Sequence, residues 1–319
     1  MDLARRLDPA GVPRSDVITV ITPEVNVLAR VRDIWRYREL LLGLVGKELK
    51  VKYKGSAIGF LWSMLNPALT LAIFYFIFQI VLQNRMPYFA IFLMTGLLVY
   101  NLFSYACMNA TGTMVGNAGI VKKVAFPREI LALASVLAGV VFFFFQALVL
   151  LVVLGAARYT HIAWGFLPLL IPAFIALVLF AAALSVFLAA VNVYFRDTQH
   201  LAEILIGSLW FWATPIVYQY VQIGNELAKH HLPSGLLLIN PLTDIVLVFQ
   251  RAIYGIVSYQ ANGSVVSLRP TLSGNQVLPV AGEWWYLWHV LVVLGLSCGL
   301  VLGALYVFGR LEGNFAEEL

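Results

Sequence analysis

Residues 47–67 of the chain read KELKVKYKGSAIGFLWSMLNP. The segment begins with four lysines and then becomes an apolar run that continues to Ile80 without another charge. Lys and Arg stay on the cytoplasmic side of a bilayer, because their translocation is unfavourable. This junction predicts that the chain enters a membrane from the cytoplasm near Gly59, and it sets the orientation of every later span.

The composition predicts an integral membrane protein. Hydrophobic residues make up 61% of the chain and charged residues 12%, whereas soluble domains are about 25% charged. Residues 1–30 carry acids and bases throughout and contain no apolar core, which argues against a cleavable signal peptide. The net charge of +5 comes from residues at predicted membrane edges, so we expect no nucleic-acid partner.

The apolar runs predict an all-α membrane protein with about six transmembrane helices, because each span needs roughly 20 apolar residues. We expect a cytoplasmic tail at 1–30, an interfacial helix at 31–46 and a transmembrane domain at 47–319. The expected spans lie near 58–83, 88–115, 130–156, 163–191, 200–221 and 285–309. With both termini inside, 16 of the 21 Lys and Arg residues face the cytoplasm and five face out.

Two segments outside the spans have amphipathic patterns. Residues 31–46 place Trp35, Arg36 and Arg38 at the boundary between an apolar and a charged face, which predicts a helix lying on the membrane surface; a helix on a soluble partner is the alternative. An outer region at 222–284 contains NPLTDIVLVFQRAIYG at 240–255, too short and charged to cross. We expect a helix that re-enters from outside or lies at the outer interface, followed by an external loop or hairpin at 258–282.

Ionisable side chains are almost absent from the predicted spans, where ion-coupled transporters and intramembrane enzymes need them. The sequence contains no phosphate-binding loop, no zinc-protease motif and no nucleophile-elbow motif. We therefore expect no catalytic residue, metal or cofactor in this chain. A gradient-driven flippase and a glycan-modifying membrane enzyme are disfavoured on the same ground, and energy for uphill movement would come from another subunit.

Two short inner loops are candidate docking sites for such a subunit. The first, 116–131, carries Lys122, Lys123, Phe126, Pro127, Arg128 and Glu129, and the second, 192–203, carries Arg196 and Asp197. A short helix with an apolar tip and flanking charges suits a groove on a partner. The positive-inside rule alone would also place these charges there, so the residues leave both interpretations open.

The ordered set KELKVKYKGSAIGFLWSMLNP, VKKVAFPREIL, FRD, WFWATPIVY and NPLTDIVLVFQRAIYG resembles the membrane subunit of polysaccharide-exporting ATP-binding-cassette transporters. That family exports lipid-linked O-antigen, teichoic acid, capsule and cell-wall galactan. The resemblance covers about residues 30–310. A drug, lipid or peptide is the alternative cargo.

The resemblance implies a permease that acts as a homodimer in the cell membrane and exports a polyprenyl-linked polysaccharide. ATP and Mg would bind a separate cytosolic P-loop ATPase. The resemblance assigns Lys122 through Glu129 to the coupling helix. It also makes the aromatic residues of the first and fifth spans candidates for a channel wall on which sugar rings slide; packing or lipid contact is the alternative. These candidates are Phe74, Tyr75, Phe78, Trp210, Phe211 and Trp212.

Overall fold

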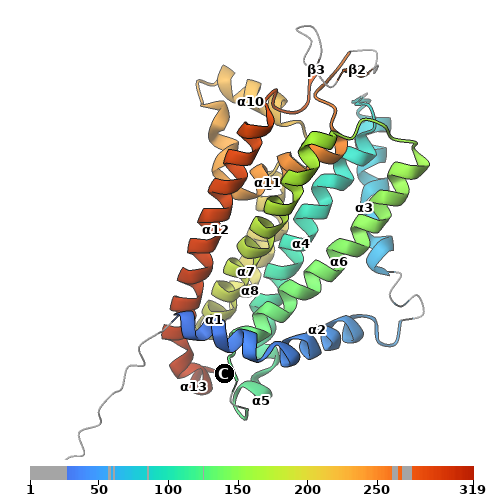
Figure 1. The fold of residues 1–319 in the computed structure, drawn as a ribbon. Helices are drawn as coiled ribbons and strands as arrows, with labels where there is room; N and C mark the ends of the chain where they lie inside the picture. Colours follow the sequence, from blue (N-terminus) through green and yellow to red (C-terminus); the bar gives the residue numbers. More distant parts are fainter. Residues whose placement is uncertain are drawn as a thin grey trace, which may run out of the picture.

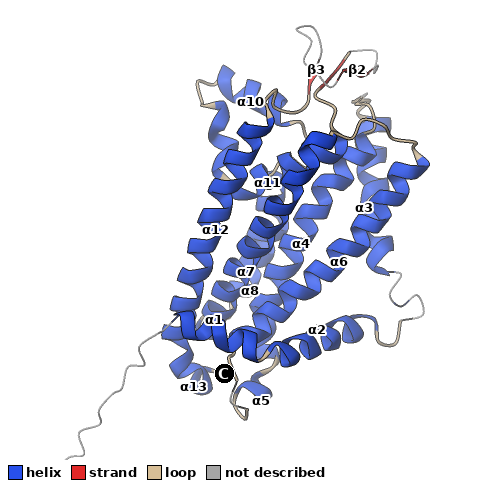
Figure 2. Ribbon diagram, in the orientation of Figure 1, coloured by secondary structure: helices blue, strands red, loops and turns tan. Residues whose placement is uncertain are grey.

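The computed structural model describes residues 27–56, 59, 62–84, 86–124, 126–260, 265–267 and 275–319. The described chain is nearly all helical, with three short strands at one end (Figure 2). The predicted all-α membrane class is confirmed. Residues 1–26 of the predicted tail lie outside the described residues.

Five helices are long and apolar enough to cross a membrane: Met64–Val81, Phe89–Gly116, Glu129–Ala156, Trp164–Tyr194 and Glu283–Asn314. They correspond to α3 (Trp62–Tyr75) with η2 (Phe76–Val81), α4 (Phe89–Gly116), α6 (Glu129–Ala156), η3 (Trp164–Leu169) with α7 (Leu170–Tyr194), and α12 (Glu283–Leu311) with η7 (Glu312–Asn314). The shorter helices are α1 (Val27–Arg36), α2 (Arg38–Tyr53), α5 (Ala118–Val121), α8 (Thr198–Ile204), η4 (Leu205–Leu209), α9 (Trp210–Trp212), α10 (Tyr220–Lys229), η5 (Ser234–Ile239), α11 (Pro241–Phe249), η6 (Gln250–Tyr254) and α13 (Phe315–Glu318).

The predicted span at 200–221 is not a continuous helix. Elements α8, η4 and α9 together cover 15 residues and end at Trp212, and residues 213–219 are irregular. The reason is Pro215, which lacks an amide donor and disfavours helical geometry at Thr214. The count of six spans is therefore not confirmed, and five described helices meet the length criterion.

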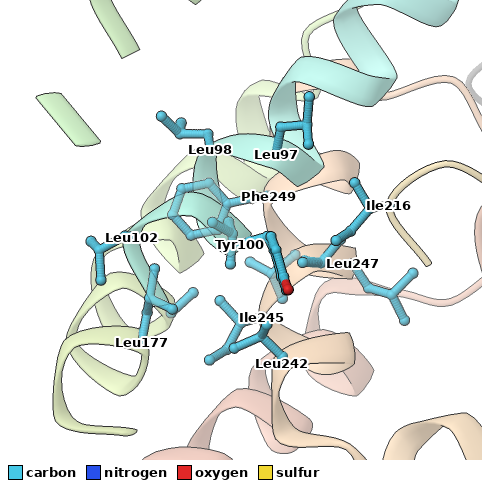
Figure 3. Close-up of a cluster of buried hydrophobic side chains, with 14 of the residues drawn as sticks. Leu97, Leu98, Tyr100, Leu102, Leu177, Ile216, Leu242, Ile245, Leu247 and Phe249 are labelled. Carbon is cyan, nitrogen blue, oxygen red and sulfur yellow. The ribbon is translucent and has the colours of Figure 1, made fainter. Parts of the chain in front are cut away.

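Helix α4 is the centre of the bundle. Most of its side chains are buried, and Phe92, Val99 and Phe103 have no measurable exposure. The short helix α11 packs against it and is buried along its whole length from Leu242 to Phe249. Figure 3 shows Leu242, Ile245 and Leu247 of α11 near Tyr100 of α4, and Phe249 of α11 near Leu98. The segment 240–255 is thus part of the protein core.

The bundle has two unlike ends (Figure 1). One end, called here the basic end, carries α1, α2, α5 and α13, and α2 runs crosswise beneath the bundle. The other, called the sheet end, carries α10 and a three-stranded antiparallel sheet of order β2–β1–β3. The strands are β1 (Ser258–Tyr259), β2 (Val265–Ser267) and β3 (Asn275–Gln276), within the predicted external loop or hairpin.

The interfacial segment predicted at 31–46 is two helices, α1 and α2, that meet at Tyr37. Trp35, Arg36 and Arg38 are all exposed, and the Arg38 guanidinium lies 5.9 Å from the Trp35 ring centroid. On the opposite side, Val45 is buried against Ala134 and Ala138 of α6. The pair of helices therefore has one face on the bundle and leaves its aromatic and basic boundary residues outward.

Candidate functional site

A polar cavity of about 580 Å³ lies between α2, α3, α4, α6 and α8 and is open at the surface of the chain, where Trp62 is 42% exposed. Residues 47–67 supply four of its lining residues, Lys52, Trp62, Asn66 and Pro67. The remaining lining residues are Thr70, Asn101, Ser104, Tyr105, Met108, Asn109, Phe142, Gln146, Gln199 and Glu203. The segment that predicts membrane entry thus also forms one wall of this polar cavity.

Side-chain amides on the spanning helices give this cavity its polarity. The Nδ2 group of Asn101 on α4 donates a hydrogen bond of 2.9 Å to Oε1 of Gln146 on α6. An amide in an apolar medium is costly unless it is paired, and polar residues within spans mark the paths of polar substrates. The cavity therefore offers neutral donors and acceptors from the spanning helices, together with the charged side chains of Lys52 and Glu203.

Lys52 brings a positive charge to the same cavity. Its Nζ lies 4.2 Å from the ring centroid of Tyr105 and 4.3 Å from that of Phe142, within the range of cation–π attraction. Desolvation lowers the pKa of Lys52, and the negative charge of Glu48 opposes this shift. Glu48 is itself fixed, because its Oε1 accepts a 2.7 Å hydrogen bond from Ser135.

A second cavity of about 380 Å³ continues the polar lining towards the basic end. The two cavities share Lys52, Tyr105 and Asn109. The second one extends to Lys47 and Asn117, which are joined by a 3.3 Å hydrogen bond. Polar side chains thus line a continuous series of cavities from the basic end into the bundle.

Some of the six predicted channel aromatics pack against the core and others are exposed, and none lines the 580 Å³ cavity. Phe74 and Phe211 stack with centroids 5.9 Å apart, and Phe78 stacks on Phe89 at 5.7 Å. These three predicted aromatics pack against the core, while Tyr75 and Trp212 are exposed. The aromatic residues at the polar cavity are instead Trp62, Tyr105 and Phe142.

Trp210 has an identifiable structural role. Its Nε1 donates a 2.9 Å hydrogen bond to Oδ1 of Asn240, which also accepts from the Leu242 amide and so caps α11. The Nδ2 of Asn240 donates to Thr214 and to the Ala213 carbonyl. Asn240 therefore joins the end of α9 to the start of α11, as expected for Asn at an N-cap before Pro241.

The predicted coupling loop has a buried part and an exposed part. Its buried part belongs to an ion-pair cluster made by Arg30, Arg128, Glu129 and Glu312. Glu129, the first residue of α6, is fully buried and pairs with Arg30, which also binds Glu312 at 2.8 Å. Arg128 donates a 2.8 Å hydrogen bond to the Glu312 carbonyl. The cluster fastens α1, the loop and the end of α12 to one another.

The rest of the predicted docking surface is open. Lys122 and Lys123 are exposed beside Val124, whose side chain is 53% accessible. Phe126 and Pro127 are half-buried, and Phe126 packs against the core at this end. Arg196 and Asp197 of the second loop are also exposed. A partner at this end would therefore meet the two lysines, while Arg128 and Glu129 face other parts of the chain.

A family profile described as ABC-2 type transporter matches residues 39–254. The chain belongs to the ABC-2 type transporter family. The chain is 35% identical to a curated relative, the O-antigen export system permease protein RfbA of Myxococcus xanthus, over 225 residues. The matched region is 70% of this chain and 84% of the relative. The chain is 33% identical to a Klebsiella pneumoniae RfbA over 284 residues, covering 88% and 95%.

A more distant relative is the polysialic acid transport protein KpsM of Escherichia coli, 24% identical over 210 residues, which are 65% of this chain and 78% of KpsM. Family membership confirms the resemblance drawn from the sequence motifs, and it makes the chain a multi-pass ABC-2 permease subunit. No group of three or more His, Cys, Asp or Glu suited to a metal occurs among the residues that the structure describes.

A search of the sequence for ionisable side chains within the spans does not find the amide residues that line the polar cavity. Asn66, Asn101 and Gln146 are neutral, so they do not interrupt an apolar run in the way that a charge does. Their signal was available as amides inside predicted spans, where a polar group needs a partner. Their convergence on one cavity depends on how α3, α4 and α6 pack.

Proposed function

We propose that this chain is the permease subunit of an ATP-driven exporter that moves a polyprenyl-linked polysaccharide from the cytoplasmic to the outer face of the cell membrane. In this proposal the basic end and both termini face the cytoplasm, and two copies form the translocation path. The chain itself catalyses no reaction. ATP and Mg bind to a separate cytosolic ATPase that docks at the basic end.

The observation that carries the proposal is the polar cavity. Amides can donate to and accept from sugar hydroxyls at once, and Trp62 and Tyr105 add rings suited to the apolar faces of sugars. The charge of Lys52 suits the phosphate of a lipid-linked glycan. The names of the relatives support the same cargo class, because they describe O-antigen export and polysialic acid transport.

The outer surface of α3 supports a contact with a second copy. The spanning window Met64–Val81 is only 6% buried, against 78% for the window in α4. Leu69 and Ile73 of α3 and Ile80 of η2 are each about half exposed. An apolar helix that also lines the polar cavity is well placed to pack against its counterpart, so that two cavities share one path.

The proposal is tested by purifying the tagged chain gently from its own membranes and identifying what accompanies it. We expect a stoichiometric P-loop ATPase, and we expect vesicles containing both proteins to translocate the lipid-linked glycan only with ATP. Absence of an ATPase across several mild detergents would contradict the partner. Sustained transport under ATP depletion with an intact proton gradient would support a flippase instead.

A further inference from the structure

A separate polar cavity of about 400 Å³ lies at the sheet end, at the opposite end of the bundle from α2. Seven of its eight lining residues are amides, and they represent a third of the 21 Asn and Gln residues in the chain. The lining residues are Gln83, Asn84, Gln219, Gln222, Asn225, Tyr259, Asn275 and Gln276. We call this the amide cavity.

Three parts of the chain build the amide cavity. Gln219, Gln222 and Asn225 are spaced by three residues at the start of and along α10, so they share one helix face. In the sheet, β1 pairs Tyr259 with Asn275 and Ser258 with Gln276. Gln83 and Asn84 follow the end of η2. Segments more than 190 residues apart in sequence, from Gln83 to Gln276, therefore place the same side-chain chemistry around one space.

The floor of the amide cavity is fixed, whereas its rim is open. Gln219 and Tyr259 are buried, and Gln219 Nε2 donates a 3.1 Å hydrogen bond to the Tyr259 hydroxyl. Gln222 and Asn225 are exposed at the rim on α10. The turn that presents Gln83 has a left-handed backbone, with φ of 48°, which few residues other than glycine adopt. The backbone N–H of Asn84 secures this turn by donating to the Phe78 carbonyl at 3.0 Å.

The lining chemistry selects a class of ligand. Each amide offers both donors and an acceptor without carrying charge, which matches the hydroxyl groups of a sugar. No charged side chain is among the eight described residues that line the cavity, so these residues offer an anionic headgroup no counter-charge. A neutral, polyhydroxylated ligand fits these side chains best.

We propose that the amide cavity binds neutral sugar units of the exported glycan at the outer end of the permease. This inference rests on the proposed function, and it adds a binding site on the side where the glycan emerges. Tyr259, Asn275 and Gln276 lie beyond residues 39–254, the region matched by the family profile. The site therefore depends on strands β1 and β3 of this chain, and the side chains of these two strands contribute to the choice of glycan.

The test uses the full chain in lipid nanodiscs and, as the probe, the polysaccharide released by mild acid from the envelope of the cell that produces the protein. Binding is measured by titration calorimetry. The test variant is Gln222→Leu with Asn225→Leu, two exposed positions at the rim. The matched control is Glu226→Leu with Lys229→Leu. These two exposed residues of the same helix form a 2.7 Å ion pair, and neither lines the cavity.

We expect the amide variant to weaken the Kd at least tenfold and the control to leave it within twofold. Equal Kd values for the wild type and the amide variant, or no binding by the wild type, would overturn the proposed site. In parallel, the amount of glycan on the cell surface is measured in cells that lack this protein. Its persistence would overturn the proposed function, whereas its loss together with an unaffected Kd in the amide variant would overturn the site alone.

Discussion

The ammonium group of Lys52 lies 4.2 Å from the centroid of the Tyr105 ring. Lys52 belongs to α2, which runs across the basic end, and Tyr105 belongs to the central helix α4. This contact brings a cation from the surface helix to the wall of the polar cavity. In the proposed function, Lys52 is therefore the residue at which a cation reaches the lining of the polar cavity.

Replacing Lys52 tests this relationship. We expect Lys52→Met to lower ATP-driven glycan export about tenfold or more, because the phosphate loses its cationic partner at the cavity; tenfold corresponds to about 1.4 kcal/mol. Lys52→Arg keeps the charge and should retain most of the export. The matched control is Lys50→Met, an exposed lysine of the same helix that does not line the cavity. Equal export by the Lys52→Met and Lys50→Met variants would contradict the role of Lys52.

Reversing charge at the exposed loop tests the docking surface. We expect Lys122→Glu with Lys123→Glu to abolish stimulation of the partner ATPase while the chain remains folded, since both side chains are exposed. Lys229→Glu makes the same kind of change at the sheet end and should leave stimulation intact. ATPase rates of the purified complex measure the effect. Normal stimulation in the double variant would return the loop to ordinary membrane topology.

The ion-pair cluster predicts a stability effect. Arg30→Ala leaves the fully buried Glu129 without its cationic partner, and an unpaired buried charge costs about 3 kcal/mol. We expect a lower Tm in detergent and partial recovery when Glu129→Gln is added, because the uncompensated charge is then removed. Arg32→Ala, at an exposed position of the same helix, is the control. A Tm equal to that of the wild type would show that the cluster contributes little.

Gly255 is predicted to be irreplaceable. Its φ is +66°, and an added Cβ would lie 2.0 Å from the His161 carbonyl oxygen. We expect Gly255→Ala to lower the free energy of unfolding by at least about 2 kcal/mol, from backbone strain combined with this clash. Gly235→Ala adds a Cβ in open space and should be tolerated. The Tm of each variant in detergent measures both effects.

Asp244 predicts a pH dependence of stability. Burial raises its pKa to about 7, from an ordinary value of 3.8, and its Oδ1 has no hydrogen-bond partner among the described residues. Between these two pKa values the folded chain holds a proton that the unfolded chain releases. Raising the pH through this window therefore destabilises the folded state, by about 4 kcal/mol when complete.

The Asp244→Asn variant isolates this contribution. We expect the Tm of the wild type to fall relative to that of the variant between pH 5 and pH 8, with the difference levelling off above pH 7. Tyr220 is the titratable neighbour whose pKa responds to Asp244, and it is present in both proteins. A Tm difference independent of pH would show that Asp244 is charged in the folded chain throughout this range.

Much of the fold follows from local sequence. Five of the six predicted spans coincide with the five long apolar helices, because an apolar run of about 20 residues has few alternatives in a membrane. The break after Trp212 also had a local signal, since Pro215 follows Thr214 in the predicted fifth span. The prediction of a span at 200–221 was based on apolar composition and did not take account of Pro215.

Only part of the candidate site could be predicted from the sequence. The exposure of Lys122, Lys123 and Arg196 was predictable from charge alone. The positions of Glu129 and Trp210 were not, because each is fixed by a partner distant in sequence: Arg30 for Glu129 and Asn240 for Trp210. Neither partner is marked by spacing or by a shared motif.

The sequence by itself determined that this protein is a bundle of membrane helices with a basic end, because hydrophobicity and charge act on each segment independently of its neighbours. Only the tertiary structure decided which polar side chains meet. Asn101 reaches Gln146 across two helices, and Gln83 shares a cavity with Gln276. Such contacts depend on the packing of whole helices and strands, which is a property of their combined shapes rather than of any one segment.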